Sequence, residues 1–243
     1  MPSSLFEPLR QCAQEIGAVV TLGDHDGYSG LRPTQYHLDV EADEIALRVL
    51  HGAGFRVVSE ESGVTGGGEY TVVLDPIDGS TNCDHGVPFF ATSLAVLRGS
   101  ELVVALVANQ VTGALYEAER GGGAWRNGEK ISSSAQRELG ASIVSFSGLP
   151  SHYLGWAQYR SLGAASLEIC LVADGSLDAF SVASQSRLHP WDYLGGLLIA
   201  EESGAAVGEY EGEALITSER VRRRPCFAAT SELLTQLFDA QPF

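Results

Sequence analysis

The chain has 243 residues, enough for one large domain or two small ones, and 44% of them are hydrophobic. Thirty-one acidic residues against fifteen basic ones leave a formal net charge of −16, so on average the surface repels a nucleic-acid backbone. No apolar run approaches the roughly 20 residues that cross a bilayer, and no secretory signal pattern opens the chain. We therefore expect a cytoplasmic protein without nucleic-acid or membrane partners.

Hydrophobic spacing predicts helices and strands along the whole chain. A helix is expected over 5–22, and a loop rich in Gly and Asp follows at 23–36. We expect this loop to be mobile until metal and substrate bind. A hairpin with an Asn-Gly turn is expected at 121–128. The other predicted helices are 38–52, 163–174, 192–204 and 231–239, and the predicted strands are 55–58, 70–74, 90–97, 102–109, 114–118, 142–146, 177–181, 214–217 and 226–229.

These elements suggest two subdomains. The first, residues 1–138, begins with two helices and continues with antiparallel strands, and the second, 139–243, mixes helices and strands. Four cysteines lie far apart and form no C-x-x-C pair, so we expect reduced, buried thiols (Cys12, Cys83, Cys170 and Cys226). The basic run Arg222-Arg223-Arg224 is expected to be a solvated turn before the last strand.

The most informative stretch is Asp75-Pro-Ile-Asp78-Gly-Ser80-Thr-Asn82, which follows the strand-like run at 70–74. Two carboxylates three residues apart at a strand end can converge on one point, although the same residues also suit an ordinary turn. Hard oxygen ligands of this kind suit Mg²⁺ or Ca²⁺ better than Zn²⁺. If a helix opens at Gly79-Ser80, its free N–H groups would face a phosphate.

Three further carboxylates are weaker signals when each is taken alone. Glu61 lies in Ser59-Glu60-Glu61-Ser62, a pattern that also suits a solvated turn. Asp43 reads as a surface residue of the helix at 38–52. Asp192 opens the helix at 192–204 and suits a capping position.

In combination these residues resemble the motifs of the inositol monophosphatase family of Mg²⁺-dependent, Li⁺-sensitive phosphatases. The resemblance runs in order over residues from about 38 to 235. Five segments carry it: Ser59-Glu60-Glu61-Ser62 is similar to a Gly-Glu-Glu-Ser box, Asp75–Asn82 to Asp-Pro-x-Asp-Gly-Thr-x-Asn, Trp191-Asp192 with Gly195-Gly196 to Trp-Asp-x-Ala-Ala-Gly, Arg160-Ser-Leu-Gly163 to Arg-Ser-x-Gly, and Gly123–Gly128 to a Gly-Ala-x-x-Asn-Gly hairpin.

The resemblance implies a layered α/β fold, an αβαβα sandwich of the inositol monophosphatase and fructose-1,6-bisphosphatase type, with the metals between its halves. It also implies two or three Mg²⁺ ions and a homodimer. Four carboxylates and one carbonyl oxygen would hold the metals: Glu61, Asp75, Asp78, Asp192 and the Ile77 carbonyl.

The resemblance also assigns the nucleophile and the substrate contacts. Ser80, with Asp43 behind it through Glu61 or water, would deprotonate and orient the attacking water. The substrate and its phosphate would contact Asp78, Gly79, Ser80, Gly163, Ala164 and Asp192.

Two positions depart from the family pattern. Ser80 stands where Thr is usual, and the hydroxyl is kept. Val182 stands where the animal inositol enzymes have a substrate-binding Glu, so Arg187 or His189 is expected to face the substrate instead. For His189 a role in packing or helix entry is an equally open alternative.

The leading hypothesis is Mg²⁺-dependent hydrolysis of a small soluble phosphate monoester, such as an inositol monophosphate or a sugar phosphate, by metal-activated water. Fructose 1,6-bisphosphate, 3′-phosphoadenosine 5′-phosphate and histidinol phosphate are alternative substrates on the same fold. A relative that binds metal or ligand without turnover is the alternative from another class. An EF-hand Ca²⁺ module is disfavoured because its ligand pattern is missing.

Overall fold

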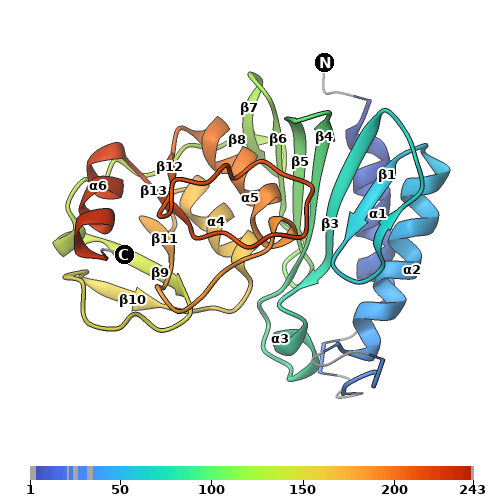
Figure 1. Cartoon of the computed structure of the whole chain (residues 1–243), viewed down its shortest axis with the longest axis horizontal. Helices are drawn as coiled ribbons and strands as arrows, with labels where there is room; N and C mark the ends of the chain where they lie inside the picture. Colours follow the sequence, from blue (N-terminus) through green and yellow to red (C-terminus); the bar gives the residue numbers. More distant parts are fainter. Residues whose placement is uncertain (1–3, 21, 24–26, 32–34, 242–243) are drawn as a thin grey trace.

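The computed structural model describes residues 4–20, 22–23, 27–31 and 35–241, and its helices and strands form five layers (Figure 1). Helices α1 (Phe6–Val19) and α2 (His37–Gly52) cover the outer face of an eight-stranded sheet. Helices α4 (Ala165–Ala173) and α5 (Pro190–Ser203) separate it from a five-stranded sheet, whose far side is covered by α6 (Ser231–Ala240). The predicted αβαβα sandwich is confirmed.

The eight-stranded sheet is antiparallel except for one parallel pair, β1 with β3. Its central strands are apolar on both faces because helices cover both sides. The predicted Asn-Gly hairpin joins β7 to β8, with positive φ at both turn residues. In spatial order the strands are β2 (Gly63–Thr65), β1 (Arg56–Ser59), β3 (Tyr70–Asp78), β4 (Ala91–Arg98), β5 (Glu101–Asn109), β6 (Leu115–Glu119), β7 (Gly123–Arg126) and β8 (Glu129–Lys130).

The five-stranded sheet is mixed. Strand β9 pairs in parallel with both β10 and β11, and β13 pairs antiparallel with β11 and β12. A 3₁₀ helix, Leu139–Ala141, precedes this sheet. In spatial order its strands are β10 (Gln158–Arg160), β9 (Ile143–Ser147), β11 (Ala179–Val182), β13 (Pro225–Ala228) and β12 (Ala206–Glu209).

One predicted strand is wrong. Residues 214–217 form no strand, and the edge of the second sheet is β12 instead. The apolar side chains of Leu215 and Ile216 pack against the core around α4 and α5, and the Leu215 carbonyl accepts a hydrogen bond from Tyr193 at 2.8 Å. Their hydrophobicity therefore reflects packing against a helix and not pairing in a sheet.

Two adjacent glycines let α5 lie close to its neighbours on both sides. A Cβ at Gly195 would lie 2.5 Å from Ser93 Oγ of β4, and one at Gly196 would lie 2.7 Å from Ile169 Cβ of α4. No larger residue fits at either position. Glycine therefore lets α5 pack closely against the first sheet, although α5 belongs to the second half of the chain. As a result, the start of α5 lies near the carboxyl end of β3.

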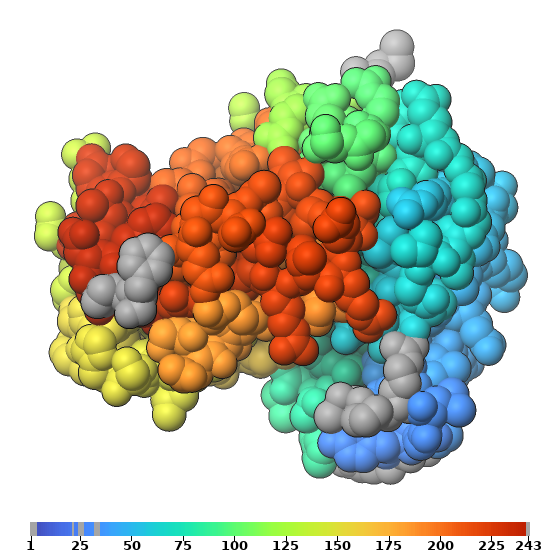
Figure 2. Space-filling view, viewed as in Figure 1, coloured from blue at the N-terminus to red at the C-terminus, as the bar shows by residue number. Residues whose placement is uncertain are grey.

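Further expectations concern the whole chain. The four cysteines are free and buried, as predicted. No helix among the described residues has the length and apolar character that a membrane span requires. The first sheet ends at Lys130 and the second begins at Ile143, while the division into subdomains at 138/139 stays a prediction. The segment 211–224, between β12 and β13, crosses in front of α5 (Figure 1) and lies against the first half of the molecule at the surface (Figure 2).

Candidate functional site

Strand β3 carries the signature acids, and it continues through Asp78 instead of turning at Pro76 as predicted. Asp75 pairs with Ser93 and Asp78 with Ala91, so Pro76 and Ile77 together face one residue of β4, Thr92. This is a β-bulge, and it re-aims the side chains beside it. Thr92 Oγ1 donates to the Pro76 carbonyl at 2.8 Å and Ile77 N to Asp75 Oδ1 at 3.1 Å, which fixes the bulge.

Three carboxylates from separate elements form an acidic cluster of Glu60, Asp75 and Asp192. One oxygen of each lies within 4.8 Å of the other two. Glu60 follows β1, and its N–H donates to the Leu74 carbonyl of the parallel neighbour β3 at 3.1 Å. Asp192 lies in the first turn of α5, where it accepts the His189 N–H at 2.7 Å. Both halves of the chain therefore contribute to one site.

The electrostatics of the acidic cluster fit a hard cation. Burial, and then the neighbouring Asp192 and Glu61, raise the pKa of Glu60 to about 9. Burial and Asp78 raise the pKa of Asp192 to about 7, and the pKa of Asp75 also lies well above its usual range because it is buried. Carboxylates that repel one another away from water are stabilised by a bound divalent ion. An all-oxygen donor set favours Mg²⁺ or Ca²⁺.

The sequence predicts Glu61 as a metal ligand, but the structure places its neighbour Glu60 in the acidic cluster. Glu61 lies outside the cluster and accepts a hydrogen bond from the Gln35 side chain. Both glutamates lie in the turn between β1 and β2, after the last strand residue Ser59, and of the two only Glu60 contributes to the cluster. The Glu-Glu motif predicts where the site lies, but it does not predict which of its two glutamates belongs to the cluster.

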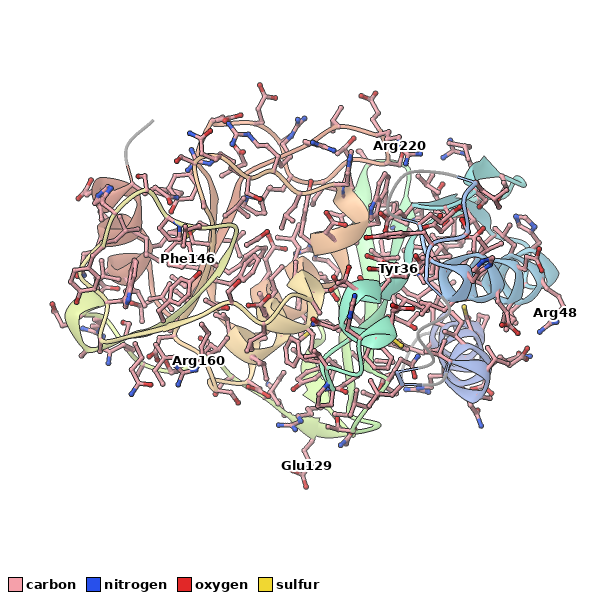
Figure 3. All side chains as sticks on the ribbon, turned by 90° about the horizontal axis from the view of Figure 1, so that it is seen from below. Tyr36, Arg48, Glu129, Phe146, Arg160 and Arg220 are labelled. Atoms are coloured by element: carbon pink, nitrogen blue, oxygen red, sulfur yellow. The ribbon has the colours of Figure 1, made fainter. Side chains whose placement is uncertain are left out.

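The acid near Ser80 also differs from the predicted one. Burial raises the pKa of Asp39 to about 7, and the nearby Ser80 hydroxyl partly offsets this rise. Asp39 also accepts the Tyr36 N–H at 2.9 Å at the start of α2, and Figure 3 shows Tyr36 in the middle of the molecule, beside α3 (Ser80–Asp84). The predicted residue Asp43 lies one turn further along α2 and accepts a hydrogen bond from Ser59. Asp39 therefore occupies the place that the sequence assigns to Asp43.

Asp78 is turned toward α4 and is not part of the acidic cluster. Its carboxylate accepts the N–H groups of Ala165 at 3.1 Å and Ser166 at 2.7 Å, and the Ser166 hydroxyl as well. These bonds satisfy free donors at the first turn of α4. Burial, partly offset by these bonds, raises the pKa of Asp78 to about 7. The metal roles of Asp78 and of the Ile77 carbonyl stay predictions.

Gly79 and Asn82 join the signature to the second half of the chain. Gly79 has a φ of 91°, and a Cβ there would lie 3.1 Å from both the Gly163 carbonyl and Ala164 Cβ. Asn82 Nδ2 donates to the Leu162 carbonyl at 2.8 Å and to the Phe89 carbonyl at 2.7 Å. The two segments are therefore in contact, whereas substrate binding by Gly79, Ser80, Gly163 and Ala164 stays a prediction.

A pocket of about 190 Å³ adjoins the acidic cluster. Its lining includes Asp78 from the first half of the chain and Asp192 with other residues from the second half. The sequence analysis misses Glu168, a buried acid on α4 that lines this pocket and accepts the Leu162 N–H at 3.0 Å and the Gly163 N–H at 3.2 Å. A lone charge in the apolar run of α4 (Ala165–Ala173) is the signal that marks it.

The residues expected to face the substrate are engaged in protein contacts. Arg187 pairs with Glu211 and donates to the Ser184 and Ser186 carbonyls, both at 2.8 Å. His189 stacks on Trp191, with 4.4 Å between ring centroids, and its Nδ1 lies 3.1 Å from the Val221 carbonyl. His189 also begins α5, as the helix-entry alternative expects. Val182 is buried in β11.

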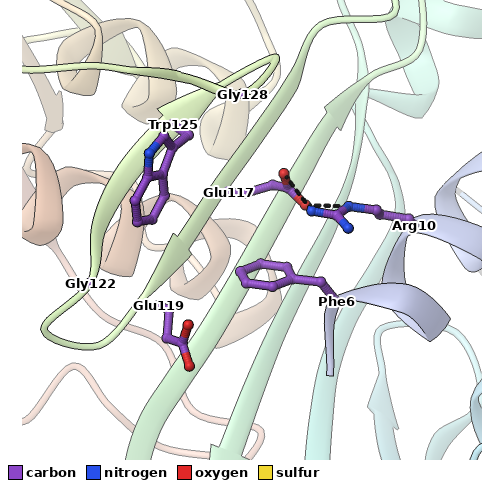
Figure 4. Close-up of a pocket in the computed structure, with 7 residues that line it drawn as sticks. All are labelled: Phe6, Arg10, Glu117, Glu119, Gly122, Trp125 and Gly128. Atoms are coloured by element: carbon purple, nitrogen blue, oxygen red, sulfur yellow. Dashed lines mark hydrogen bonds and ion pairs between the residues drawn. The ribbon is translucent and has the colours of Figure 1, made fainter. Parts of the chain in front are cut away.

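A larger pocket, about 470 Å³, lies between α1 and the β6–β7 hairpin (Figure 4). Phe6 and Trp125 provide its aromatic walls, and Arg10 forms two hydrogen bonds to Glu117, at 2.7 and 3.0 Å. The charges of this pair offset each other, and the lining contains no acidic cluster. The chemistry of the described residues therefore centres on Glu60, Asp75 and Asp192.

Known proteins resemble this chain over most of its length. The family model described as the inositol monophosphatase family matches residues 33–241. A relative from Archaeoglobus fulgidus, named fructose-1,6-bisphosphatase/inositol-1-monophosphatase, is 35% identical over 212 residues, which is 86% of this chain and 79% of the relative. A relative from Neisseria meningitidis, named putative Nus factor SuhB, is 37% identical over 175 residues, 65% of this chain and 66% of the relative.

The fold has close counterparts among solved structures. A hypothetical protein from Pyrococcus horikoshii, described as having similarities for inositol-1 monophosphatase, superposes with a TM-score of 0.85 at 29% identity, covering 98% of this chain and 97% of that one. Fold, site and relatives together define a phosphoric monoester hydrolase. The chain belongs to the inositol monophosphatase family, as its motifs predict.

Proposed function

We propose that the protein hydrolyses a small soluble phosphate monoester in a reaction that requires Mg²⁺. The observation that carries this proposal is the acidic cluster, in which the buried Asp75 and the partly buried Glu60 and Asp192, from both halves of a phosphatase-family chain, have carboxylate oxygens within 4.8 Å of one another. Oxygen donors in this number and environment suit Mg²⁺.

Two or three Mg²⁺ ions would be held by Glu60, Asp75 and Asp192, together with Asp78 and the Ile77 carbonyl. When bound, Mg²⁺ offsets the charge of the phosphate ester, lowers the pKa of water and stabilises the leaving oxygen. Glu60 takes the place that the sequence gives to Glu61, because Glu60 is the glutamate in the cluster.

The chain itself would supply the base for the attacking water. The Ser80 hydroxyl lies near the Asp39 carboxylate and would donate to it, which leaves its oxygen lone pairs free to accept a hydrogen bond from water. A proton that leaves the water then passes through Ser80 Oγ to Asp39, whose raised pKa suits proton transfer near neutral pH. The backbone N–H groups of Gly79 and Ser80 would contact the phosphate.

The remainder of the ester would occupy the pocket of about 190 Å³. Ser147 and Ser161 give this pocket hydroxyl groups, which match a substrate that itself carries hydroxyls. An inositol monophosphate or a sugar phosphate fits this description, and the Archaeoglobus relative is named for both kinds of substrate. 3′-Phosphoadenosine 5′-phosphate and histidinol phosphate stay alternatives.

A binding role without turnover is the second candidate. One relative is named as a factor and not as an enzyme, and Arg187 and His189 here are engaged in protein contacts. The Asp39–Ser80 pair argues against this role, because a protein that only binds needs no base. From the family resemblance we further propose a homodimer, Li⁺ inhibition and a cytoplasmic location.

Phosphate release by the purified protein in Mg²⁺ tests the proposal. The panel contains inositol 1-phosphate, fructose 1,6-bisphosphate, 3′-phosphoadenosine 5′-phosphate and histidinol phosphate. We expect turnover of at least one ester, abolished by EDTA and by Asp75→Asn. Mg²⁺ binding without phosphate release from any of them would favour the binding role.

A further inference from the structure

The arginines of segment 211–224 do not form the solvated turn that the sequence predicts. Four of the fifteen basic residues of this acidic chain lie within five positions, 220–224. Leu188 and Arg223 exchange two backbone hydrogen bonds, at 2.9 and 2.8 Å, and these fasten the segment to the entrance of α5. The basic residues are thereby held beside Asp192 of the acidic cluster.

Two of these arginines form contacts within the fold. Arg224 is buried, and its guanidinium lies 4.3 Å from the centroid of the Tyr210 ring. Arg223 donates to the Ala214 carbonyl at 3.0 Å and pairs with Glu213 at 3.7 Å. Their positive charges are therefore turned into the segment itself.

Arg220 and Arg222 instead lie exposed at the rim of the site. The Arg220 guanidinium lies 5.0 Å from the centroid of the Trp191 ring and donates to the Glu60 carbonyl at 3.2 Å. Arg222 Nε donates to His189 Nε2 at 3.0 Å. Among the ion pairs of the described residues neither arginine has a carboxylate partner. Figure 3 shows Arg220 at the edge of the molecule.

We propose that Arg220 and Arg222 form a subsite for a second phosphate group of the substrate. This inference rests on the proposed function, since it supposes that the first phosphate binds at the acidic cluster. Arg220 donates to the backbone carbonyl of Glu60, whose carboxylate belongs to that cluster, so the arginine rim adjoins the place where the first phosphate would bind. A guanidinium offers several donors in a planar fork that matches phosphate oxygens.

The subsite selects bisphosphorylated over monophosphorylated esters. A guanidinium at the rim binds a neutral hydroxyl only weakly, whereas it forms a charge-assisted hydrogen bond with a phosphate. The stacked rings of His189 and Trp191 hold both arginines in place, so little conformational entropy is lost when the phosphate arrives.

The test compares fructose 1,6-bisphosphate with fructose 1-phosphate, which lacks the second phosphate. We expect Arg220→Gln to lower kcat/KM for the bisphosphate by about tenfold or more and for the monophosphate by less than about threefold. Arg222→Gln should act in the same direction, and Arg220→Lys should recover part of the loss. Arg48→Gln, which removes an exposed charge on α2 paired with Glu15, is the matched control and should change neither rate.

Equal losses on both esters, or no loss on either, would overturn the subsite. If the wild-type protein hydrolyses neither ester, the proposed function is judged by the remaining esters of the panel and the subsite by calorimetry in Mg²⁺. The bisphosphate must then bind more tightly than the monophosphate, and Arg220→Gln must remove that difference. A thermal melt shows whether each variant is folded.

Discussion

The two sides of the site are built in different ways. On the side of the first sheet, the partly buried Glu60 and the buried Asp75 lie at the ends of β1 and β3, where backbone hydrogen bonds and a β-bulge hold them. On the side of the second half, exposed arginines stand on the irregular segment 211–224. The carboxylates that would need fixed geometry lie at the ends of regular strands, and the arginines that we propose for recognition lie on a long connection.

The contrast also concerns charge. The carboxylates of the acidic cluster are forced together and raise one another's pKa values. Arg220 and Arg222 contact the edge of this cluster without pairing with its carboxylates. A cation and an anionic ester can therefore enter the same site, each opposite its own counter-charge.

The largest expected effect comes from removing a carboxylate of the acidic cluster. Glu60→Gln should lower phosphate release by about 1,000-fold, since even outer partners of a metal site cost 10–100-fold. Glu61→Gln, its neighbour outside the cluster, should stay within about fivefold of the wild type. Initial rates at saturating Mg²⁺ measure both. A loss confined to Glu61→Gln would return the metal role to that residue.

The next effect separates the base from the metal ligands. Asp39→Asn and Ser80→Ala should each lower kcat by about 100-fold, the usual contribution of a positioned base. Because the two act as one unit, the double variant should lose little more than either single one. Single-turnover and steady-state rates measure this. Fully multiplicative losses would mean that the residues act independently.

A third effect tests the junction of the two halves. Gly79→Ala should lower the free energy of unfolding by about 2–3 kcal/mol, because its φ is positive and the 163–164 segment fills the space of a Cβ. Gly99→Ala, also at positive φ but with open space around it, should cost only about 1 kcal/mol. Urea unfolding measures both. Equal costs would show that the close contact at Gly79 adds nothing.

The smallest effect is a coupling between pH and metal. The folded-state pKa values of Glu60, about 9, and Asp192, about 7, exceed the ordinary values of 4.5 and 3.8. The folded protein therefore holds more protons than the unfolded one between about pH 4 and 9, and the metal-free protein loses stability as pH rises through that window. Mg²⁺ displaces these protons, so its affinity should rise by up to about tenfold per pH unit for each proton displaced.

Thermal melts with and without Mg²⁺ at pH 6.0, 7.0 and 8.0 check this coupling. The rise in Tm caused by Mg²⁺ should be greater at the higher pH, and Glu60→Gln should reduce that difference. A rise in Tm that is the same at each pH would mean that the cluster is already ionised without metal.

Much of this fold follows from local patterns. Apolar periodicity predicts α1 and α2 and the long central strands, and the Asn-Gly pair predicts the β7–β8 hairpin, because each depends on neighbours close in the chain. The predicted strand at 214–217 fails because its apolar residues pack against a helix from elsewhere in the chain. Hydrophobicity indicates burial, and only the fold decides what covers the residue.

The same division holds at the site. The motifs by themselves determine the family, the layered fold and the segments that meet, since Asp75 and Asp192 both enter the acidic cluster. Only the tertiary structure decides that Glu60 and Asp39 face the site and not Glu61 and Asp43. The direction in which a side chain points depends on how its strand or helix is turned against its neighbours. A motif records which residues are present, and packing between distant segments sets that rotation.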